Sequence, residues 1–351
     1  MNAKERRYKM GKERIVFVDY ARALGIFLVV FAHCLQKYCD GMDFSNHFIY
    51  SFHMPLFFVI SGFLLSLKDV KIEKLPRTAK RLLGPYFFWS AFYVLLMFVQ
   101  SLVQPSHDFD VKERLCAILT GRGLAPLWFL WNLLFSEIIF VLVNCWLKLR
   151  TKTKIVVVLF VLAVVTYLCD LFFASYRHHF EDCELVLYLF ISITRLAPSV
   201  FFLFVGSLFT HVNNAGFTKK GDFALGLVSV AVFALIQTYT DNSVNMHLIH
   251  YGNPFVFLMT GSLASIGILW FCKLLPSDLK ILSFVGKKTL DIMVLHYPPM
   301  PFMALFAFVA GLVFPEKNVF VVFLISVLLT ATLCFAGVVL DKVRSIIRLP
   351  I

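Results

Sequence analysis

The sequence predicts an all-α integral membrane protein, a bundle of about ten transmembrane helices with both termini in the cytoplasm. Three observations support this prediction. Hydrophobic residues make up 60% of the 351 positions and charged residues only 15%, whereas soluble proteins average about 25% charged residues. Ten apolar runs are each close to the roughly 20 residues that cross a bilayer as a helix. Lys and Arg residues are concentrated in alternate loops between these runs.

The apolar runs define the expected helices in chain order. They cover roughly residues 15–37, 48–67, 82–103, 125–147, 154–174, 185–210, 222–239, 254–275, 289–314 and 319–340. We therefore expect a basic cytoplasmic arm over 1–14, one transmembrane domain over 15–340 and a short cytoplasmic tail over 341–351. Because Asp19 and Arg22 interrupt the first run, we expect an uncleaved helix rather than a signal peptide.

The net charge of +12 indicates membrane topology rather than a nucleic-acid partner. With the N-terminus placed in the cytoplasm, the loops predicted inside hold 25 Lys and Arg residues and the loops predicted outside hold six. The positive-inside rule requires this alternation. The sequence therefore predicts a multi-pass protein of the plasma or inner membrane, embedded in the lipid bilayer.

The first span carries three ionisable residues, Asp19, Arg22 and His33. A charge near the bilayer centre costs about 2.5–3.5 kcal/mol on insertion scales, so such residues usually serve chemistry or transport. Eleven residues make about three helical turns, which places Arg22 and His33 on one face with Asp19 beside them. Asp19 lies about 21 Å from His33 along the helix. We therefore expect Asp19 to pair with Arg22 instead.

Five motifs follow one another along the chain. They are Asp19-x-x-Arg22-x10-His33, Phe57-Phe58-x-x-Ser61-Gly62-Phe63, Arg81-Leu-Leu-Gly-Pro85, Trp128-Phe129-Leu130 and Gly286-x-x-Thr289-Leu290 followed by His296. Together they resemble membrane acyltransferase family 3, integral membrane O-acyltransferases, over about residues 15–340. Thr78 stands where the loop of that family usually has a basic residue, which leaves open which loop cation meets the donor.

The resemblance implies an enzyme, an O-acetyltransferase, that moves an acyl group from cytoplasmic acyl-CoA to a hydroxyl of an envelope glycan or related acceptor, in a bacterial membrane. Acetyl-CoA is the expected donor substrate, and neither a bound cofactor nor a metal ion is expected. His33 is the expected base, because a histidine with its ordinary pKa near 6.5 is mostly neutral at pH 7. A covalent acyl-histidine stays open as an alternative.

The remaining site residues divide between the two substrates. Arg22, near the cytoplasmic end of the first span, suits the phosphates of CoA, and Arg81 and His296 are expected on the same donor. His53, Trp128 and Arg195 are expected to bind the acceptor. They form the substrate-binding set, whereas Asp19, Arg22 and His33 form the catalytic set.

Several side chains have simpler interpretations. A buried pair between Arg195 and Glu137 is an open alternative to acceptor binding. Ser61 and Gly62 are expected to allow close helix packing. The pairs His178-His179 and His247-x-x-His250 are expected to be loop residues rather than metal ligands.

A proton-coupled secondary transporter is the alternative function, because buried Asp, Arg and His residues also form proton relays. It is disfavoured because no matching Gly- or Pro-broken segments occur in two halves of the chain. Acceptor selectivity is expected in the outer loops 104–124 and 240–253. The acceptor, the acyl group, the oligomeric state and any disulfide among Cys39, Cys116 and Cys183 are left open.

Overall fold

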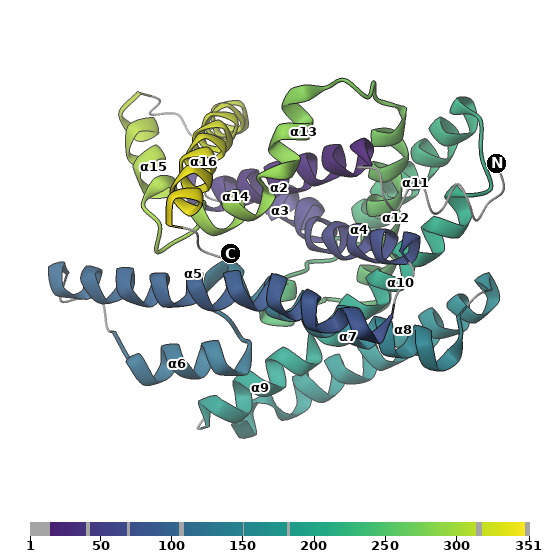
Figure 1. Cartoon of the computed structure of the whole chain (residues 1–351), viewed down its shortest axis with the longest axis horizontal. Coiled ribbons are helices and arrows are strands. Elements are labelled where there is room, and N and C mark those ends of the chain that lie inside the picture. Colours follow the sequence, from purple (N-terminus) through teal and green to yellow (C-terminus); the bar gives the residue numbers. More distant parts are fainter. Residues whose placement is uncertain are drawn as a thin grey trace.

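The computed structural model describes residues 15–39, 43–68, 71–104, 109–149, 151–180, 183–313 and 318–347. Within these ranges the regular structure is helical (Figure 1), which confirms the all-α prediction. Nine helical segments of the described chain are long and apolar enough to cross a membrane. The protein is therefore a multi-pass integral membrane protein, and the predicted basic arm over 1–14 lies outside the described residues.

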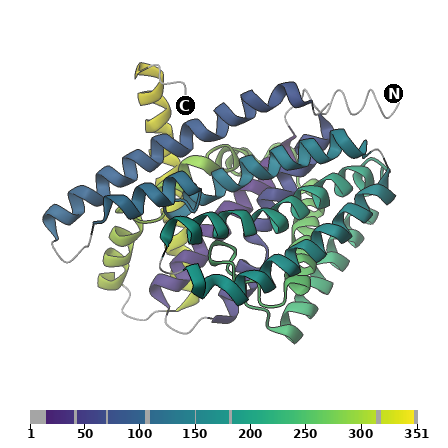
Figure 2. The same ribbon diagram turned by 90° about the horizontal axis from the view of Figure 1, so that it is seen from below.

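The helices are named in chain order. They are α2 (Val16–Tyr38), α3 (Asp43–Tyr50), α4 (His53–Leu67), α5 (Leu75–Val103), α6 (Val111–Thr120), α7 (Trp128–Leu147), α8 (Lys152–Tyr176), α9 (Glu184–Thr194), α10 (Leu196–Asn213), α11 (Lys219–Thr240), α12 (Pro254–Leu274), α13 (Lys280–Lys287), α14 (Thr289–Leu295), α15 (Phe302–Val313) and α16 (Val319–Ile347). Helix α2 packs against α4, α12, α13 and α16, and α5 runs along one edge of the bundle (Figure 2).

The predicted span over 289–314 is not one helix. Helix α14 ends at Leu295, and α15 begins only at Phe302. Pro298, Pro299 and Pro301 lie in the break. Because proline has no backbone N–H to donate, these residues cannot continue the helical hydrogen bonding. The segment that hydropathy alone presents as one span is therefore two short helices.

Side chains of α5 satisfy carbonyl groups near this break. The Tyr93 hydroxyl donates to the Val294 carbonyl oxygen at 2.5 Å, and the Gln100 amide donates to the Pro299 carbonyl oxygen at 3.0 Å. Irregular backbone is tolerated at membrane depth only where protein or a cavity surrounds it. The break is thus supported from a neighbouring helix.

Three further boundaries differ from the prediction. The expected outer loop 104–124 contains α6, whose N-terminus is capped by Asp110 and whose end is followed by Gly121 at φ +77°. The expected span 185–210 is divided at Arg195 into α9 and α10. The expected tail over 341–351 is helical as far as Ile347, because α16 continues beyond its apolar part.

Glycines allow α4 and α10 to approach closely. A Cβ atom on Gly62 would collide with the backbone of Leu203, and a Cβ atom on Gly206 would collide with the backbone of Val59 and Phe63. Backbone atoms cannot move aside as a flexible side chain can. Gly62 of the second motif therefore acts through helix packing, as the sequence predicts.

We expect Gly62→Ala to destabilise the protein by about 1–3 kcal/mol, because overpacking a tight contact forces the backbone to shift. The measurement is thermal unfolding of the purified protein in detergent. Gly84→Ala in α5 is the matched control, since a Cβ atom at Gly84 meets nothing within 4 Å. Equal melting temperatures for the two variants would contradict the packing role.

Candidate functional site

A cavity of about 330 Å³ lies beside the C-terminal half of α2. Its walls come from α2, α3, α4, the start of α7, residues 245–248 of the loop between α11 and α12, and α14 with Tyr297. The size falls at the lower end of the range for small-molecule sites. The cavity therefore brings together elements that are far apart in the sequence.

Helix α2 contributes one stripe of side chains to the cavity. Ile26, Val29, His33 and Gln36 all line it, and their spacing of three or four residues places them on one helix face. The ten residue steps from Ile26 to Gln36 cover about 15 Å along the axis. His33 lies in the C-terminal part of this stripe, in the last turns of α2.

The His33 ring is surrounded by polar side chains, most of which are aromatic. Its Nδ1 atom lies 3.4 Å from Gln36 Oε1 and 3.3 Å from the Tyr50 hydroxyl. Its ring centroid lies 5.3 Å from that of His296 and 4.8 Å from that of Tyr297. Because Gln36 Oε1 can only accept a hydrogen bond, this contact fits a proton on Nδ1 of His33. Nε2 of the neutral ring then has a free lone pair.

Two more predicted site residues, His53 and His296, line the same cavity with defined tautomers. Nδ1 of His53 lies 2.8 Å from the Ile49 carbonyl oxygen, and Nδ1 of His296 lies 2.8 Å from the Met293 carbonyl oxygen. A carbonyl accepts, so each Nδ1 carries the proton and each Nε2 is an acceptor. Nε2 of His296 is buried and has no hydrogen-bond partner in the described chain. An O–H group in the cavity would satisfy it.

Trp128, Arg195 and His247 form a layered group at another wall. The Arg195 guanidinium carbon lies 5.0 Å from the Trp128 ring centroid, and the His247 ring lies 5.7 Å from the same indole. Trp128 and His247 line the cavity, whereas Arg195 is not among the lining residues. Arg195 is only 1% exposed and therefore lies behind the other two.

Arg195 is held by hydrogen bonds rather than by a carboxylate. It donates to the Arg122 carbonyl oxygen at 3.2 Å, to the His247 carbonyl oxygen, and to Nδ1 of His247 at 3.3 Å. Glu137 has other partners, because its carboxylate accepts from Ser61 at 2.5 Å and pairs with Arg81 at 3.0 Å. The open alternative of an Arg195–Glu137 pair is thus not what the structure shows.

The two predicted donor cations lie outside the cavity wall. Arg22 and Asp19 approach to 3.9 Å, with Arg22 35% exposed and Asp19 buried. Arg22 precedes Ile26 by one turn on the stripe that leads to His33. Arg81 is 61% exposed beyond its contact with Glu137. Both guanidinium groups are therefore accessible, at positions away from the three histidines.

We expect Asp19→Asn and Arg22→Ala to be coupled in a double-mutant cycle. Residues in direct contact show interaction energies of about 0.5–3 kcal/mol, and the measurement is unfolding of the two single variants and the double variant in detergent. Arg81→Ala combined with Asp19→Asn is the control, because Arg81 pairs with Glu137. Strict additivity of Asp19→Asn and Arg22→Ala would rule out the pair.

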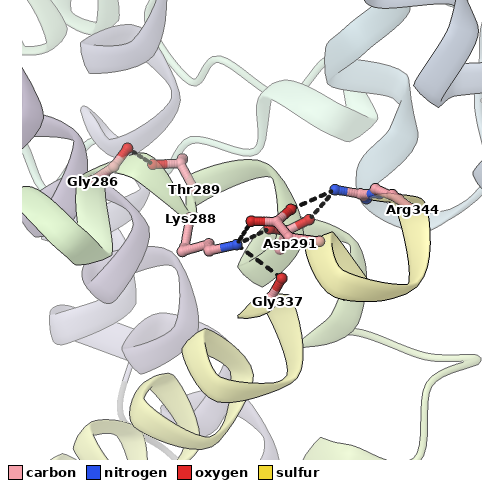
Figure 3. Close-up of polar contacts among 7 residues, drawn as sticks. Gly286, Lys288, Thr289, Asp291, Gly337 and Arg344 are labelled. Atoms are coloured by element: carbon pink, nitrogen blue, oxygen red, sulfur yellow. Dashed lines mark hydrogen bonds and ion pairs between the residues drawn. The ribbon is translucent and has the colours of Figure 1, made fainter. Parts of the chain in front are cut away.

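A charge cluster at the opposite side of α14 attaches this helix to α16 (Figure 3). We call Lys288, Asp291, Asp341 and Arg344 the α14–α16 cluster. Lys288 Nζ contacts Asp341, the Gly337 carbonyl oxygen at 2.8 Å and Asp291 at 3.3 Å. Arg344 Nη1 lies 3.1 Å from Asp291 Oδ1, an ion pair without hydrogen-bond geometry. The two cations and two carboxylates balance in charge.

Sequence reasoning missed several residues of the site. Hydropathy gives no reason to select Gln36, Tyr50 or Tyr297. His247 is a loop residue, as predicted, but its place in the cavity wall was not predicted. Of the two loops expected to recognise the acceptor, 240–253 contributes to the cavity, whereas the lining includes no residue of 104–124. Cys116 and Cys183 are free thiols in the structure.

Comparison with known proteins agrees with the motifs. The model of a family described as "Acyltransferase domain", acyltransferase 3, matches residues 15–339. The chain is 30% identical over 173 residues to nodulation protein NolL of Sinorhizobium fredii. The matched stretch covers 45% of this chain and 46% of that protein. The chain is also 32% identical over 132 residues to nodulation protein NolL of Mesorhizobium japonicum, and this match covers 34% of each of the two chains. The chain thus spans less than half the length of either relative, and no solved structure matches it. Since the family model covers nearly all of the transmembrane domain, the chain belongs to the acyltransferase 3 family.

Proposed function

We propose that the protein is a membrane O-acyltransferase that moves an acyl group from cytoplasmic acyl-CoA to a hydroxyl of an envelope glycan or related acceptor. We assign acetyl as the acyl group. The observation that carries this proposal is the position of His33. Its ring lies on the wall of a cavity that also receives His53, His296 and Trp128, in a chain of the acyltransferase 3 family. A base, a flat aromatic face and acceptor lone pairs together suit a polyhydroxylated substrate.

His33 supplies the base in this proposal. Its Nε2 takes the proton of the acceptor hydroxyl as that oxygen attacks the thioester carbonyl carbon. The new C–O bond forms, the C–S bond breaks, and the imidazolium returns the proton to the CoA thiolate. Gln36 holds Nδ1 of His33, which keeps Nε2 directed to the reaction. His53 accepts a hydrogen bond from the acyl acceptor, as expected. His296, which was expected on the CoA donor, is assigned to the acyl acceptor instead, because its ring lies 5.3 Å from that of His33 in the same cavity.

The donor approaches from the other end of α2. CoA carries its phosphates and its thioester at opposite ends of a long flexible arm. Arg22 and His33 are separated by about 16 Å along the helix. Arg22 is a partly exposed cation and Arg81 is an exposed one. We assign the phosphates to these cations because a guanidinium binds phosphate through several donors. In the topology that the sequence predicts, with both termini in the cytoplasm, this end of α2 faces the compartment that contains acyl-CoA.

The test uses membranes from cells with and without the protein. Incubation with [14C]acetyl-CoA is expected to label an envelope glycan only when the protein is present, and mass spectrometry then locates the acetate on a hydroxyl. Proton-driven solute flux without any labelled glycan would favour a secondary transporter instead. Label appearing on an amine rather than a hydroxyl would contradict the O-acyl assignment.

A further inference from the structure

His247 is held by an unusual contact with Arg195. One guanidinium nitrogen of Arg195, Nη2, contacts both the His247 carbonyl oxygen and Nδ1 of the same residue. A guanidinium has only donors, so Nδ1 of His247 must be the acceptor. In a neutral imidazole the proton then resides on Nε2.

His247 is neutral at physiological pH. Burial, with the charges of Arg195 and Arg122, lowers the pKa of His247 from 6.5 to about 3. A neutral ring with Nδ1 occupied has one remaining polar function, the Nε2–H group. None of the hydrogen bonds within the described residues uses this group, and the ring lines the cavity beside Trp128.

The loop that carries His247 is rigidly built. The side chain of Asn242 joins the two ends of the loop. Its amide N–H donates to the Tyr251 carbonyl oxygen at 3.0 Å, and its Oδ1 accepts from the Asn253 N–H at 2.7 Å. Backbone hydrogen bonds join Asn245 and His250 around the short turn that includes His247. A preorganised donor loses little entropy when a ligand arrives.

We propose that His247 is an acceptor-binding residue whose Nε2–H donates a hydrogen bond to an oxygen of the acceptor alcohol, and that Arg195 is a positioning residue that fixes this tautomer. The proposal rests on the proposed acyltransferase function. This role accounts for the hydrogen-bonding groups of the cavity, which are hydrogen-bond acceptors at Nε2 of His53 and His296 and a hydrogen-bond donor at Nε2 of His247. A sugar, whose hydroxyl groups both donate and accept, matches that arrangement.

The first experiment measures the tautomer directly and needs no substrate. In protein labelled with 15N-histidine, the His247 signals are identified by their absence from His247→Gln. We expect unprotonated Nδ1 and protonated Nε2, unchanged between pH 5 and pH 8, and a mixture of tautomers in Arg195→Gln. Protonated Nδ1, or titration near pH 6, would overturn the assignment.

The second experiment measures transfer from [14C]acetyl-CoA to the acceptor present in the host membranes. Loss of one hydrogen bond lowers binding by about tenfold, so His247→Ala is expected to reduce transfer about tenfold while the KM for acetyl-CoA stays within about twofold. His247→Gln keeps an N–H donor and is expected to recover part of the loss. The control is His250→Ala, an exposed histidine of the same loop.

The outcomes separate the two proposals. If the wild-type protein transfers no label, the proposed function fails, and the tautomer measurement still decides the role of Arg195 and His247. If the wild type is active and His247→Ala transfers at the wild-type rate, the inference fails alone. A raised KM for acetyl-CoA in His247→Ala would place the residue on the donor and overturn it as well.

Discussion

Replacing His33 with alanine is expected to reduce acyl transfer by about 10²- to 10⁴-fold, the contribution typical of a positioned general base. The reason is specific to the cavity. His33 is the histidine of the α2 stripe that continues from Arg22, and Gln36 orients its Nδ1. The measurement is the rate of label transfer from [14C]acetyl-CoA to envelope glycan in membranes with equal amounts of protein.

Two comparisons distinguish chemistry from folding. His179→Ala removes an exposed histidine remote in sequence from the cavity and is expected to retain wild-type activity. The melting temperature of His33→Ala in detergent is expected to stay close to that of the wild type, because the side chain borders a cavity rather than filling the core. A His33→Ala variant that transfers acetate at the wild-type rate would exclude His33 as the base.

The second large effect is expected at Asp291 of the α14–α16 cluster. Asp291→Ala leaves Lys288, which is 7% exposed, and Arg344 with one remaining carboxylate partner in the cluster. Breaking a buried charge pair by removing one partner costs about 3–5 kcal/mol. We therefore expect a marked fall in melting temperature. Transfer activity is expected to fall as well, since α14 carries Met293 to the cavity wall.

The matched control for this prediction is Asp278→Ala, which removes an exposed carboxylate from the turn before α13. It is expected to change stability by less than about 0.5 kcal/mol, as surface substitutions usually do. The double variant Asp291→Ala with Lys288→Ala should recover part of the lost stability, because the unpaired cation is then also removed. A melting temperature for Asp291→Ala equal to that of Asp278→Ala would show that the cluster contributes little.

The helical fold was accessible from the sequence because hydropathy and the distribution of Lys and Arg report directly on the bilayer. The stripe from Ile26 to His33 follows from the helical period alone. The break after Leu295 has a local cause, the prolines at 298, 299 and 301, yet an apolar window does not detect it because these residues interrupt neither the length nor the hydrophobicity of the run.

The site was only partly accessible from the sequence. His33, His53, Trp128 and His296 all line one cavity. The sequence indicates each of them, because each lies in a local motif or is a polar residue within an apolar span. The place of His247 depends on Arg195, 52 residues away along the chain. No spacing rule predicts such a contact, because it follows from how distant helices pack. The same holds for the ion pair between Asp291 and Arg344.

The interruption between α14 and α15 gives α5 an indirect influence on the cavity wall that α14 forms. Tyr93 is anchored on a helix that contributes no atom to the cavity wall, yet its hydroxyl secures the last turn before His296. Tyr93→Phe preserves shape and apolar area but strands a carbonyl in a medium without water, at a cost of about 1–3 kcal/mol. The proposed acyl transfer is thus expected to be sensitive to a substitution on α5, a helix that does not line the cavity.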